Sequence, residues 1–311
     1  METYAQTIDW LMKSEHPSLR VAIRRDLLHE APTPQEQAAL VDDRSPIRAI
    51  LNQMKDQTYW IYPNHFYSPK FKASHWSLLL LHEYRCPADL PEIQRACAYL
   101  LQGCQRWLDE GMIHQTKDHR MACFFGNVLR YALAFGFQDH PTVKEILSVL
   151  SHAKDGKEWT CKHNDNSPCT WAAIRTLWGY ALLPESMRMP AVQASIDSGI
   201  DLICHSQEMM QTVNHAPTVK KHAQWEKISF PLYYQSDRLF TLRVLAEHGQ
   251  ANHALLQPAV AWLESKRKEN GRWHGSNPNK SRSWPYGFTP EDTDRWVTMQ
   301  ALCVLNAVKE G

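Results

Sequence analysis

Three ten-residue segments align without gaps, and this repeat constrains the fold more strongly than any other feature of the sequence. Each segment contains a Lys, an acidic residue directly after it, and a Trp five residues after the Lys. The segments are LNQMKDQTYW (51–60), LSHAKDGKEW (150–159) and ESKRKENGRW (264–273). Their starts lie 99 and 114 residues apart. These spacings are close to twice a unit of about 50 residues, which favours a helical repeat protein.

Apolar segments of a second kind lie between the repeated ones. They are apolar over most of a helical circumference, which predicts helices that are buried on nearly all sides. Segment 91–108, in contrast, is amphipathic and predicts a helix with one face in solvent. The alternation of the two kinds predicts an all-α fold with two concentric layers of helices. The apolar segments are 75–84, 123–137, 169–183, 237–249 and 294–308.

The composition is ordinary for a globular protein. The 311 residues carry a net charge of +1 with His neutral, which predicts no nucleic-acid partner. No run approaches the roughly 18 apolar residues of a transmembrane segment, and residues 1–17 lack the pattern of a secretory signal. We therefore expect a cytoplasmic protein with reduced thiols. No linker marks a boundary, so we expect one domain over 1–311, with 1–45 as an N-terminal helical extension.

The closing turn and Trp of the repeats, Asp155-Gly156…Trp159 and Asn270-Gly271-Arg272-Trp273, resemble those of terpene cyclases and protein prenyltransferase β-subunits. The pieces that are similar to a bacterial branch of this prenyltransferase and squalene oxidase repeat superfamily are PSLRVAIRRDLL, FYSPKFKASHWSLLLL, CFFGNVLR, FPLYYQSDRLFTLRVL and KRKENGRW. The resemblance covers residues 45–308. It implies an (α/α) toroid of about five to six helix pairs in an inner and an outer ring, with a cavity at one end of the inner ring.

In such a toroid the first residues of every inner helix face one mouth. Cys123 and Cys169 open two of the apolar segments, and Cys161 and His163 precede the second of these. Three thiols and one imidazole suit Zn²⁺, which prefers tetrahedral nitrogen and sulfur ligands. We therefore predict a zinc cofactor held by Cys123, Cys161, Cys169 and His163. The alternative is that the cysteines are small buried residues and that His163 is a solvated loop residue.

The same geometry places His75, Asp237 and Asp294 at the mouth as candidate catalytic residues. A carboxylic acid that aromatic side chains desolvate gains a raised pKa and becomes a proton donor. The nearest match to the acid motif of protonating cyclases is Asp292-Thr293-Asp294-Arg295, in which Arg295 replaces an Asp. The alternative for both carboxylates is a helix cap or compensation of the helix dipole.

Aromatic side chains are dense in the segments that would cover the mouth, and they predict a site for a small hydrophobic molecule. Lys70 and Lys72, with Lys220 and Lys221, are candidates for binding a phosphate or diphosphate, unless they are merely solvated. We expect the repeat tryptophans to pack between helices instead. The predicted substrate-binding residues are Tyr62, Tyr67, Trp76, Phe124, Tyr234 and Trp296.

These features together predict an enzyme of cyclase or transferase type that acts on a small hydrophobic or isoprenoid-like substrate with the assistance of zinc. The alternative is a non-catalytic ligand-binding or scaffold protein that retains the toroid fold without the cyclase acid motif. The fold alone does not decide between them, because one fold hosts many chemistries.

Overall fold

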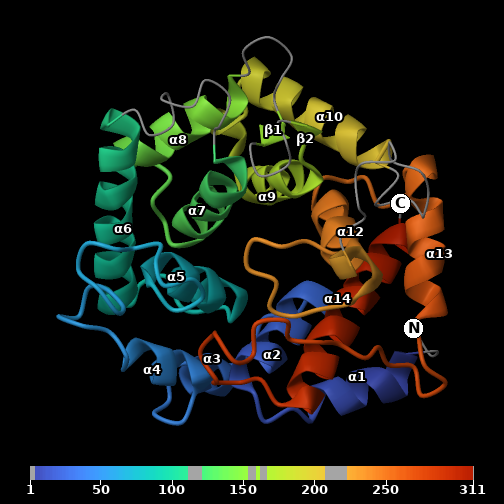
Figure 1. Cartoon of the computed structure of the whole chain (residues 1–311). Helices are drawn as coiled ribbons and strands as arrows, with labels where there is room; N and C mark the ends of the chain where they lie inside the picture. Colours follow the sequence, from blue (N-terminus) through green and yellow to red (C-terminus); the bar gives the residue numbers. More distant parts are fainter. Residues whose placement is uncertain (1–3, 111–120, 153–158, 162–166, 207–222, 311) are drawn as a thin grey trace.

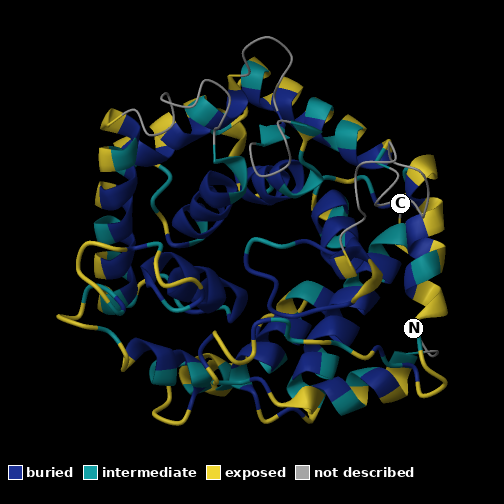
Figure 2. Ribbon diagram, viewed as in Figure 1, coloured by how far each residue is buried: buried dark blue, intermediate teal, exposed yellow. Residues whose placement is uncertain are grey.

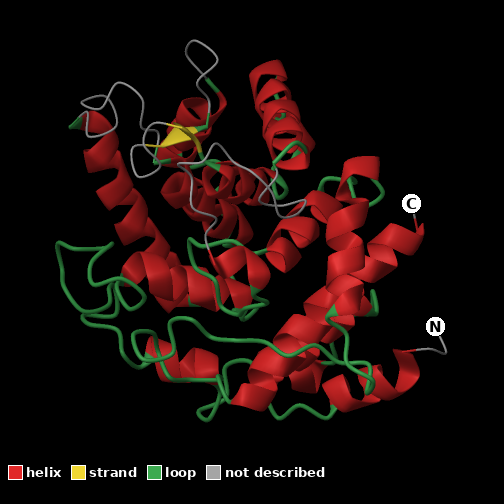
Figure 3. Cartoon of the chain, turned by 45° about the vertical axis from the view of Figure 1, so that its right-hand side comes forward, coloured by secondary structure: helices red, strands yellow, loops and turns green. Residues whose placement is uncertain are grey.

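Almost all of the regular structure is helical in the described part of the chain (Figures 1 and 3). The structure is a computed structural model, and it describes residues 4–110, 121–152, 159–161, 167–206 and 223–310. The only strands within these residues are β1 (Thr160–Cys161) and β2 (Ser167–Pro168), which form one antiparallel pair. The prediction of an all-α protein is therefore confirmed apart from this short pair. None of the described helices is long and apolar enough to cross a membrane.

Five helices lie toward the centre of the molecule, and the apolar segments of the sequence form them (Figure 1). Their side chains are buried almost all round, as Figure 2 shows, and in α5 every residue is buried. Gly136 after α7 and Gly249 after α12 adopt φ values of 86° and 71°, which glycine tolerates at a helix end. The inner helices are α5 (Ser74–Glu83), α7 (Ala122–Ala134), α9 (Thr170–Tyr180), α12 (Arg238–Glu247) and α14 (Pro290–Glu310).

A second set of helices lies outside the first in Figure 1. Each of these helices buries one stripe and exposes the opposite face, which the amphipathic pattern predicted (Figure 2). Pro91, Pro141 and Pro190 occupy the first turn of their helices, where the missing N–H of proline costs no hydrogen bond. The outer helices are α6 (Pro91–Asp109), α8 (Pro141–Ser151), α10 (Pro190–Cys204) and α13 (Gln257–Ser265).

The N-terminal residues form short helices along one side of the inner set. The amphipathic segment 16–28 is split between α2 and a π-helix, a distinction that its hydrophobic pattern did not reveal. The elements are α1 (Ala5–Met12), α2 (Pro17–Ala22), the π-helix η2 (Ile23–Leu27), α3 (Pro34–Ala39) and α4 (Pro46–Leu51). Short 3₁₀ turns elsewhere are η4 (Glu185–Met187), η5 (Ala223–Glu226) and η6 (Ala254–Leu256).

The inner helices α7 and α9 make the most extensive helix–helix contact of the molecule, and two glycines permit it. A Cβ atom on Gly126 would lie 2.4 Å from the carbonyl oxygen of Arg175, and one on Gly179 would lie 2.7 Å from that of Gly126. Both distances are too short for any side chain. The close approach of the two backbones fixes the relative position of the helix starts that carry Cys123 and Cys169.

Two of the repeat tryptophans occupy equivalent positions. The indole nitrogen of Trp60 donates to the carbonyl oxygen of Ile50 at 2.8 Å, and that of Trp273 donates to the carbonyl oxygen of Leu263 at 2.8 Å. Both tryptophans are fully buried. Trp159 is also buried, but its indole donates to Ser198 at 3.1 Å. The tryptophans thus pack between helices, as predicted.

Candidate functional site

Four of the six aromatic residues predicted to bind substrate lie together near the starts of α5 and α7. The ring centroid of His75 lies 4.6 Å from that of Phe124 and 5.8 Å from that of Tyr67. Trp76 lies 5.0 Å from Tyr67 and 5.9 Å from Tyr234 by the same measure. We call Tyr67, His75, Trp76, Phe124 and Tyr234 the aromatic cluster.

The other two predicted residues lie elsewhere. Tyr62 is 54% exposed, and its nearest aromatic partner is His65 at 6.3 Å. Trp296 is fully buried, but it stacks on Phe230 at 4.5 Å and contacts His16 at 5.8 Å. Both were predicted to line the mouth because aromatic side chains are dense in the segments that would cover it, but Tyr62 projects into solvent and Trp296 packs against Phe230 and His16.

His75 is the most unusual member of the aromatic cluster because it is a fully buried imidazole with one unpaired nitrogen. Its Nδ1 lies 3.1 Å from the hydroxyl oxygen of Tyr131, whereas Nε2 has no hydrogen-bond partner in the described part of the chain. Burial, with a smaller contribution from Arg175, lowers the pKa of His75 to about 3. The imidazole is therefore neutral at physiological pH, and its Nε2 is a buried polar atom without a partner among the described residues.

The three predicted cysteine ligands also lie close together. The antiparallel pair β1–β2 sets Cys161 opposite Ser167, and the backbone N–H of Cys169 donates to the carbonyl oxygen of Trp159 at 2.7 Å. This arrangement allows the thiol of Cys169 to hydrogen-bond the side chain of Cys161, which holds the pKa of Cys169 well above its ordinary range. Burial, and next the neighbouring Cys161, raise the pKa of Cys123 to about 11.

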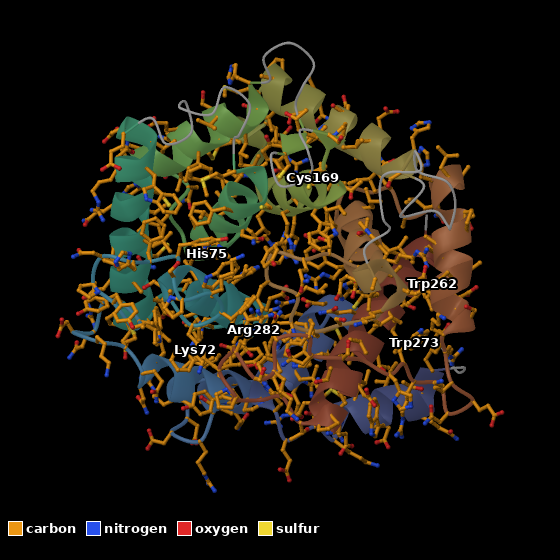
Figure 4. The ribbon with its side chains drawn as sticks, viewed as in Figure 1. Lys72, His75, Cys169, Trp262, Trp273 and Arg282 are labelled. Carbon is orange, nitrogen blue, oxygen red and sulfur yellow. The ribbon has the colours of Figure 1, made fainter. Side chains whose placement is uncertain are left out.

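Tyr67 connects the thiols with the aromatic cluster. Burial, followed by the nearby Cys123, raises the pKa of the Tyr67 phenol to about 12. The cysteines and the aromatic cluster therefore belong to one continuous region at the starts of α5, α7 and α9. Figure 4 shows His75 on α5 and Cys169 at the start of α9, both among the inner helices.

Within the described residues, no three His, Cys, Asp or Glu side chains stand in an arrangement that would hold a metal ion. The fourth predicted ligand, His163, lies outside the described residues. Lys220 and Lys221 lie outside them as well.

Asp237 caps a helix in the structure. Its carboxylate accepts hydrogen bonds of 2.8 Å from the backbone N–H groups of Phe240 and Ser229, so it fixes the start of α12. Burial nevertheless raises its pKa to about 7 despite these bonds. Asp237 is thus a structural cap that is still able to exchange a proton near neutral pH, and its catalytic role stays a prediction.

Asp294 connects α14 to the preceding segment. Its Oδ1 accepts a hydrogen bond of 2.8 Å from the N–H of Gly275, and its Oδ2 lies 2.7 Å from Nδ1 of His274. The side chain of Asp294 is 23% exposed and that of His274 is 66% exposed. The carboxylate lies among polar partners near the surface.

Arg175 is a residue of this region that the sequence prediction missed. Its side chain is 1% exposed, and its Nε has no hydrogen-bond partner. Burial lowers its pKa, and its charge acts on both His75 and Cys123. The signal for Arg175 was present, because a charged residue within an otherwise apolar helix needs a reason to be buried.

Three cations line the loops beside the aromatic cluster. Lys70 Nζ lies 4.7 Å from the ring centroid of Tyr234, and Lys72 Nζ lies 5.4 Å from that of Trp284. The guanidinium of Arg282 lies 4.8 Å from the ring centroid of Phe71. None of the three cations pairs with a carboxylate among the described residues, so their charges are available to an anion. Figure 4 labels Lys72 and Arg282 near the centre of the view.

In comparisons with known proteins, no family model matches this chain, and no curated protein or solved structure shows a significant match.

Proposed function

We propose that the chain is an enzyme of cyclase or transferase type that acts on a small hydrophobic, isoprenoid-like molecule. In this proposal the inner and outer sets of helices are the two rings of an (α/α) toroid of the prenyltransferase and squalene oxidase repeat kind. The substrate would contact the aromatic cluster at the starts of the inner helices. The observation that carries the proposal is the meeting of this cluster with three cysteines and the unpaired Nε2 of His75.

The aromatic cluster supplies the affinity for an apolar chain. Its residues come from two inner helices and two loops, and their faces and edges offer dispersion contacts to a hydrocarbon. The same faces attract a developing carbocation, which is the charged intermediate of isoprenoid chemistry. His75 stays neutral, because its low pKa excludes the imidazolium, and its Nε2 would form a hydrogen bond with the substrate.

The cations beside the cluster supply a place for an anionic head group. Lys70, Lys72 and Arg282 have aromatic neighbours but no carboxylate partners among the described residues. A phosphate or diphosphate would therefore gain charge-assisted hydrogen bonds without breaking an existing ion pair. An apolar chain with such a head group is the substrate that fits both parts of the region.

Zinc is the cofactor of this proposal. Thiolates are ligands that zinc prefers, and Cys161 and Cys169 contact each other near Cys123, but the described side chains alone are not arranged to hold the ion. We propose His163, which lies outside the described residues, as the fourth ligand. Bound zinc supplies a positive charge that holds cysteines deprotonated and activates a thiol or water bound to it. Without such a charge, the raised pKa of Cys123 keeps its thiol mostly protonated and slows its reactions.

Binding and turnover of an isoprenoid diphosphate test the proposal. Calorimetry would measure its affinity for the wild type and for Phe124→Leu, and mass spectrometry would follow its conversion. We expect Phe124→Leu to weaken binding about tenfold, because an aromatic contact of about 1 kcal/mol and part of the apolar area are lost. Tyr62→Ala is the matched control, since Tyr62 is exposed. Equal affinity of wild type and Phe124→Leu would reject the site.

The second candidate is a non-catalytic ligand-binding or scaffold protein. It is favoured by the hydrogen bonds of Asp237 and Asp294, which serve helix and loop structure. This candidate predicts that the isoprenoid diphosphate binds the aromatic cluster but is recovered unchanged. Conversion of the bound molecule by the wild type, with loss of conversion in Cys161→Ser, would show that the protein is an enzyme.

A further inference from the structure

A cavity of about 330 Å³ lies at the opposite ends of the inner helices, away from the aromatic cluster. Helices α5, α7, α9 and α12 contribute residues from their later turns, and α14 and the π-helix η2 complete the wall. The volume is within the range of sites for small molecules. No part of the proposed function uses this cavity.

Three arginine–carboxylate pairs line the charged side of the cavity. Arg243 lies 3.1 Å from Glu83, Arg130 lies 2.5 Å from Glu247, and Arg85 contacts Asp26. Only one terminal nitrogen of Arg243 is used in its pair. The remaining donors of this guanidinium, and the amide of the buried Gln300, have no hydrogen-bond partner among the described residues.

The guanidinium of Arg175 adds a fourth positive charge to this region. Arg175 lies behind the indole of Trp178, with its guanidinium carbon 5.4 Å from the ring centroid, and it forms no ion pair within the described residues. Arg130 and Arg243 lie 4.9 Å and 5.7 Å from the same centroid. Three cations thus surround one aromatic ring, and the four guanidinium groups outnumber the three paired carboxylates, of which Glu247 is exposed and Asp26 half-buried. The buried carboxyl group of Asp237 also acts on Arg175. The remaining lining carboxylate, Glu310, is exposed to solvent, which screens its charge.

His82 lines the cavity beside the arginine side chains. It is buried, and its Nε2 accepts a hydrogen bond of 3.2 Å from Nε of Arg130. Burial first, and then Arg130, Arg85 and Arg243, lower the pKa of His82 well below its ordinary value. The imidazole is therefore neutral, mainly because it is buried, and the guanidinium groups of Arg130, Arg85 and Arg243 near it would attract an anion.

Part of the cavity lining is apolar, although α14 also contributes Gln300, Asn306 and Glu310. Met299, Val304 and Ala307 on α14 and Ala246 on α12 line it, and Cys303 lies between them with its thiol 3.3 Å from the carbonyl oxygen of Asp26. We propose that this cavity is a second ligand site for a small monocarboxylate with a short apolar body. Arg243 and Gln300 would bind the carboxylate, and the α14 wall would contact the apolar body.

Butyrate is a suitable probe, and it is compared with butanol and with inorganic phosphate at equal ionic strength. Calorimetry and the thermal unfolding midpoint of the full-length protein are the readouts. We expect butyrate to bind the wild type and to bind Arg243→Gln about tenfold or more weakly, because charge-assisted hydrogen bonds are lost. Butanol lacks the charge and phosphate lacks the apolar body, so both should bind more weakly than butyrate.

Two further variants keep the test decisive if Arg243→Gln fails to fold because it leaves Glu83 buried without its partner. Gln300→Met changes no charge and should also weaken butyrate, whereas Arg106→Gln, at an exposed position of α6, should not. Butyrate should slow the alkylation of Cys303 and leave that of Cys123 unchanged. Equal binding of butyrate by wild type and Gln300→Met, or equal binding of butyrate and butanol, would overturn the proposal.

Discussion

The thiol of Cys169 hydrogen-bonds the side chain of Cys161 across the ends of β1 and β2, and Cys123 of the neighbouring inner helix lies near both. Three residues that are separated by up to 46 positions in the chain are thereby brought to one place. The contact joins the short strand pair to the starts of α7 and α9. It is the basis of the zinc proposal and of its first test.

Replacement of two of these cysteines should remove zinc. Protein purified without an affinity tag is expected to contain one zinc ion per chain, and Cys161→Ser with Cys169→Ser should lose it, because serine is a poor zinc ligand. Elemental analysis by mass spectrometry measures the metal. Cys86→Ala, at a buried cysteine on the far side of α5, is the control. A wild type that contains no zinc after growth in zinc-supplemented medium would contradict the assignment.

Asp237 should make the stability depend on pH. Its pKa in the folded protein, about 7, is raised above the ordinary 3.8, so the folded state holds the proton more tightly. The stabilisation from this protonation is complete below pH 3.8 and is lost as the pH rises through about 7. Urea unfolding of wild type and Asp237→Asn at pH 5 and pH 8 measures it. The free energy of unfolding of the wild type relative to Asp237→Asn should fall with pH, by at most about 4 kcal/mol at 1.36 kcal/mol per pKa unit.

The same experiment contains its control. Asn retains an oxygen that accepts from the N–H of Phe240, so the helix cap persists in the variant. A difference between the two proteins that is the same at pH 5 and pH 8 would show that Asp237 does not change protonation in this interval.

Trp60 should be a stability residue. Trp60→Phe removes one of the hydrogen bonds to the carbonyl oxygen of Ile50, which still accepts from the N–H of Gln53, and it opens a cavity, with an expected cost of about 1–3 kcal/mol in the free energy of unfolding. The partly exposed Trp10, whose indole donates to Glu291 at 3.3 Å, provides the comparison, and Trp10→Phe should cost less than about 1 kcal/mol. Chemical denaturation measures both. Equal losses of unfolding free energy in the two variants would show that the repeat tryptophan has no special role in stability.

Asp294→Asn distinguishes the structural role of this residue from the catalytic one. Asn retains an acceptor for the N–H of Gly275 and loses only the exposed pair with His274, so the cost should stay below about 1 kcal/mol. Turnover of an isoprenoid diphosphate should be unchanged. Loss of turnover at unchanged stability would instead make Asp294 the acid that its sequence motif indicates.

Much of the fold was predictable because the periodicity of apolar residues in a segment indicates which faces of its helix are buried. The apolar segment 123–137 and the amphipathic segment 91–108 became α7 and α6, with ends shifted by up to three residues. The split of segment 16–28 into α2 and a π-helix was not predictable, because both helix types present the same apolar stripe. The strand pair at Cys161 was missed because its strands contain two residues each.

The site was predicted less completely. Cys123 and Cys169 were found because they begin apolar segments, and the position of a helix start can be read from the sequence. Tyr62 was expected at the mouth but projects into solvent. A loop residue beside an inner helix can point in any direction, and the sequence does not indicate that direction. Arg175 and Arg243 were overlooked although each is a charged residue in an inner helix, which is the strongest available signal of a polar interior.

Alkylation of the wild type with N-ethylmaleimide tests the central proposal most directly, because Cys123 borders the aromatic cluster and Cys303 borders the opposite cavity. Peptide mass spectrometry gives the rate at each cysteine with and without an isoprenoid diphosphate. At ten times its Kd the ligand should slow labelling of Cys123 about tenfold and leave Cys303 unchanged. Unchanged labelling of Cys123 at a concentration at which calorimetry shows binding would contradict the placement of the substrate at the aromatic cluster.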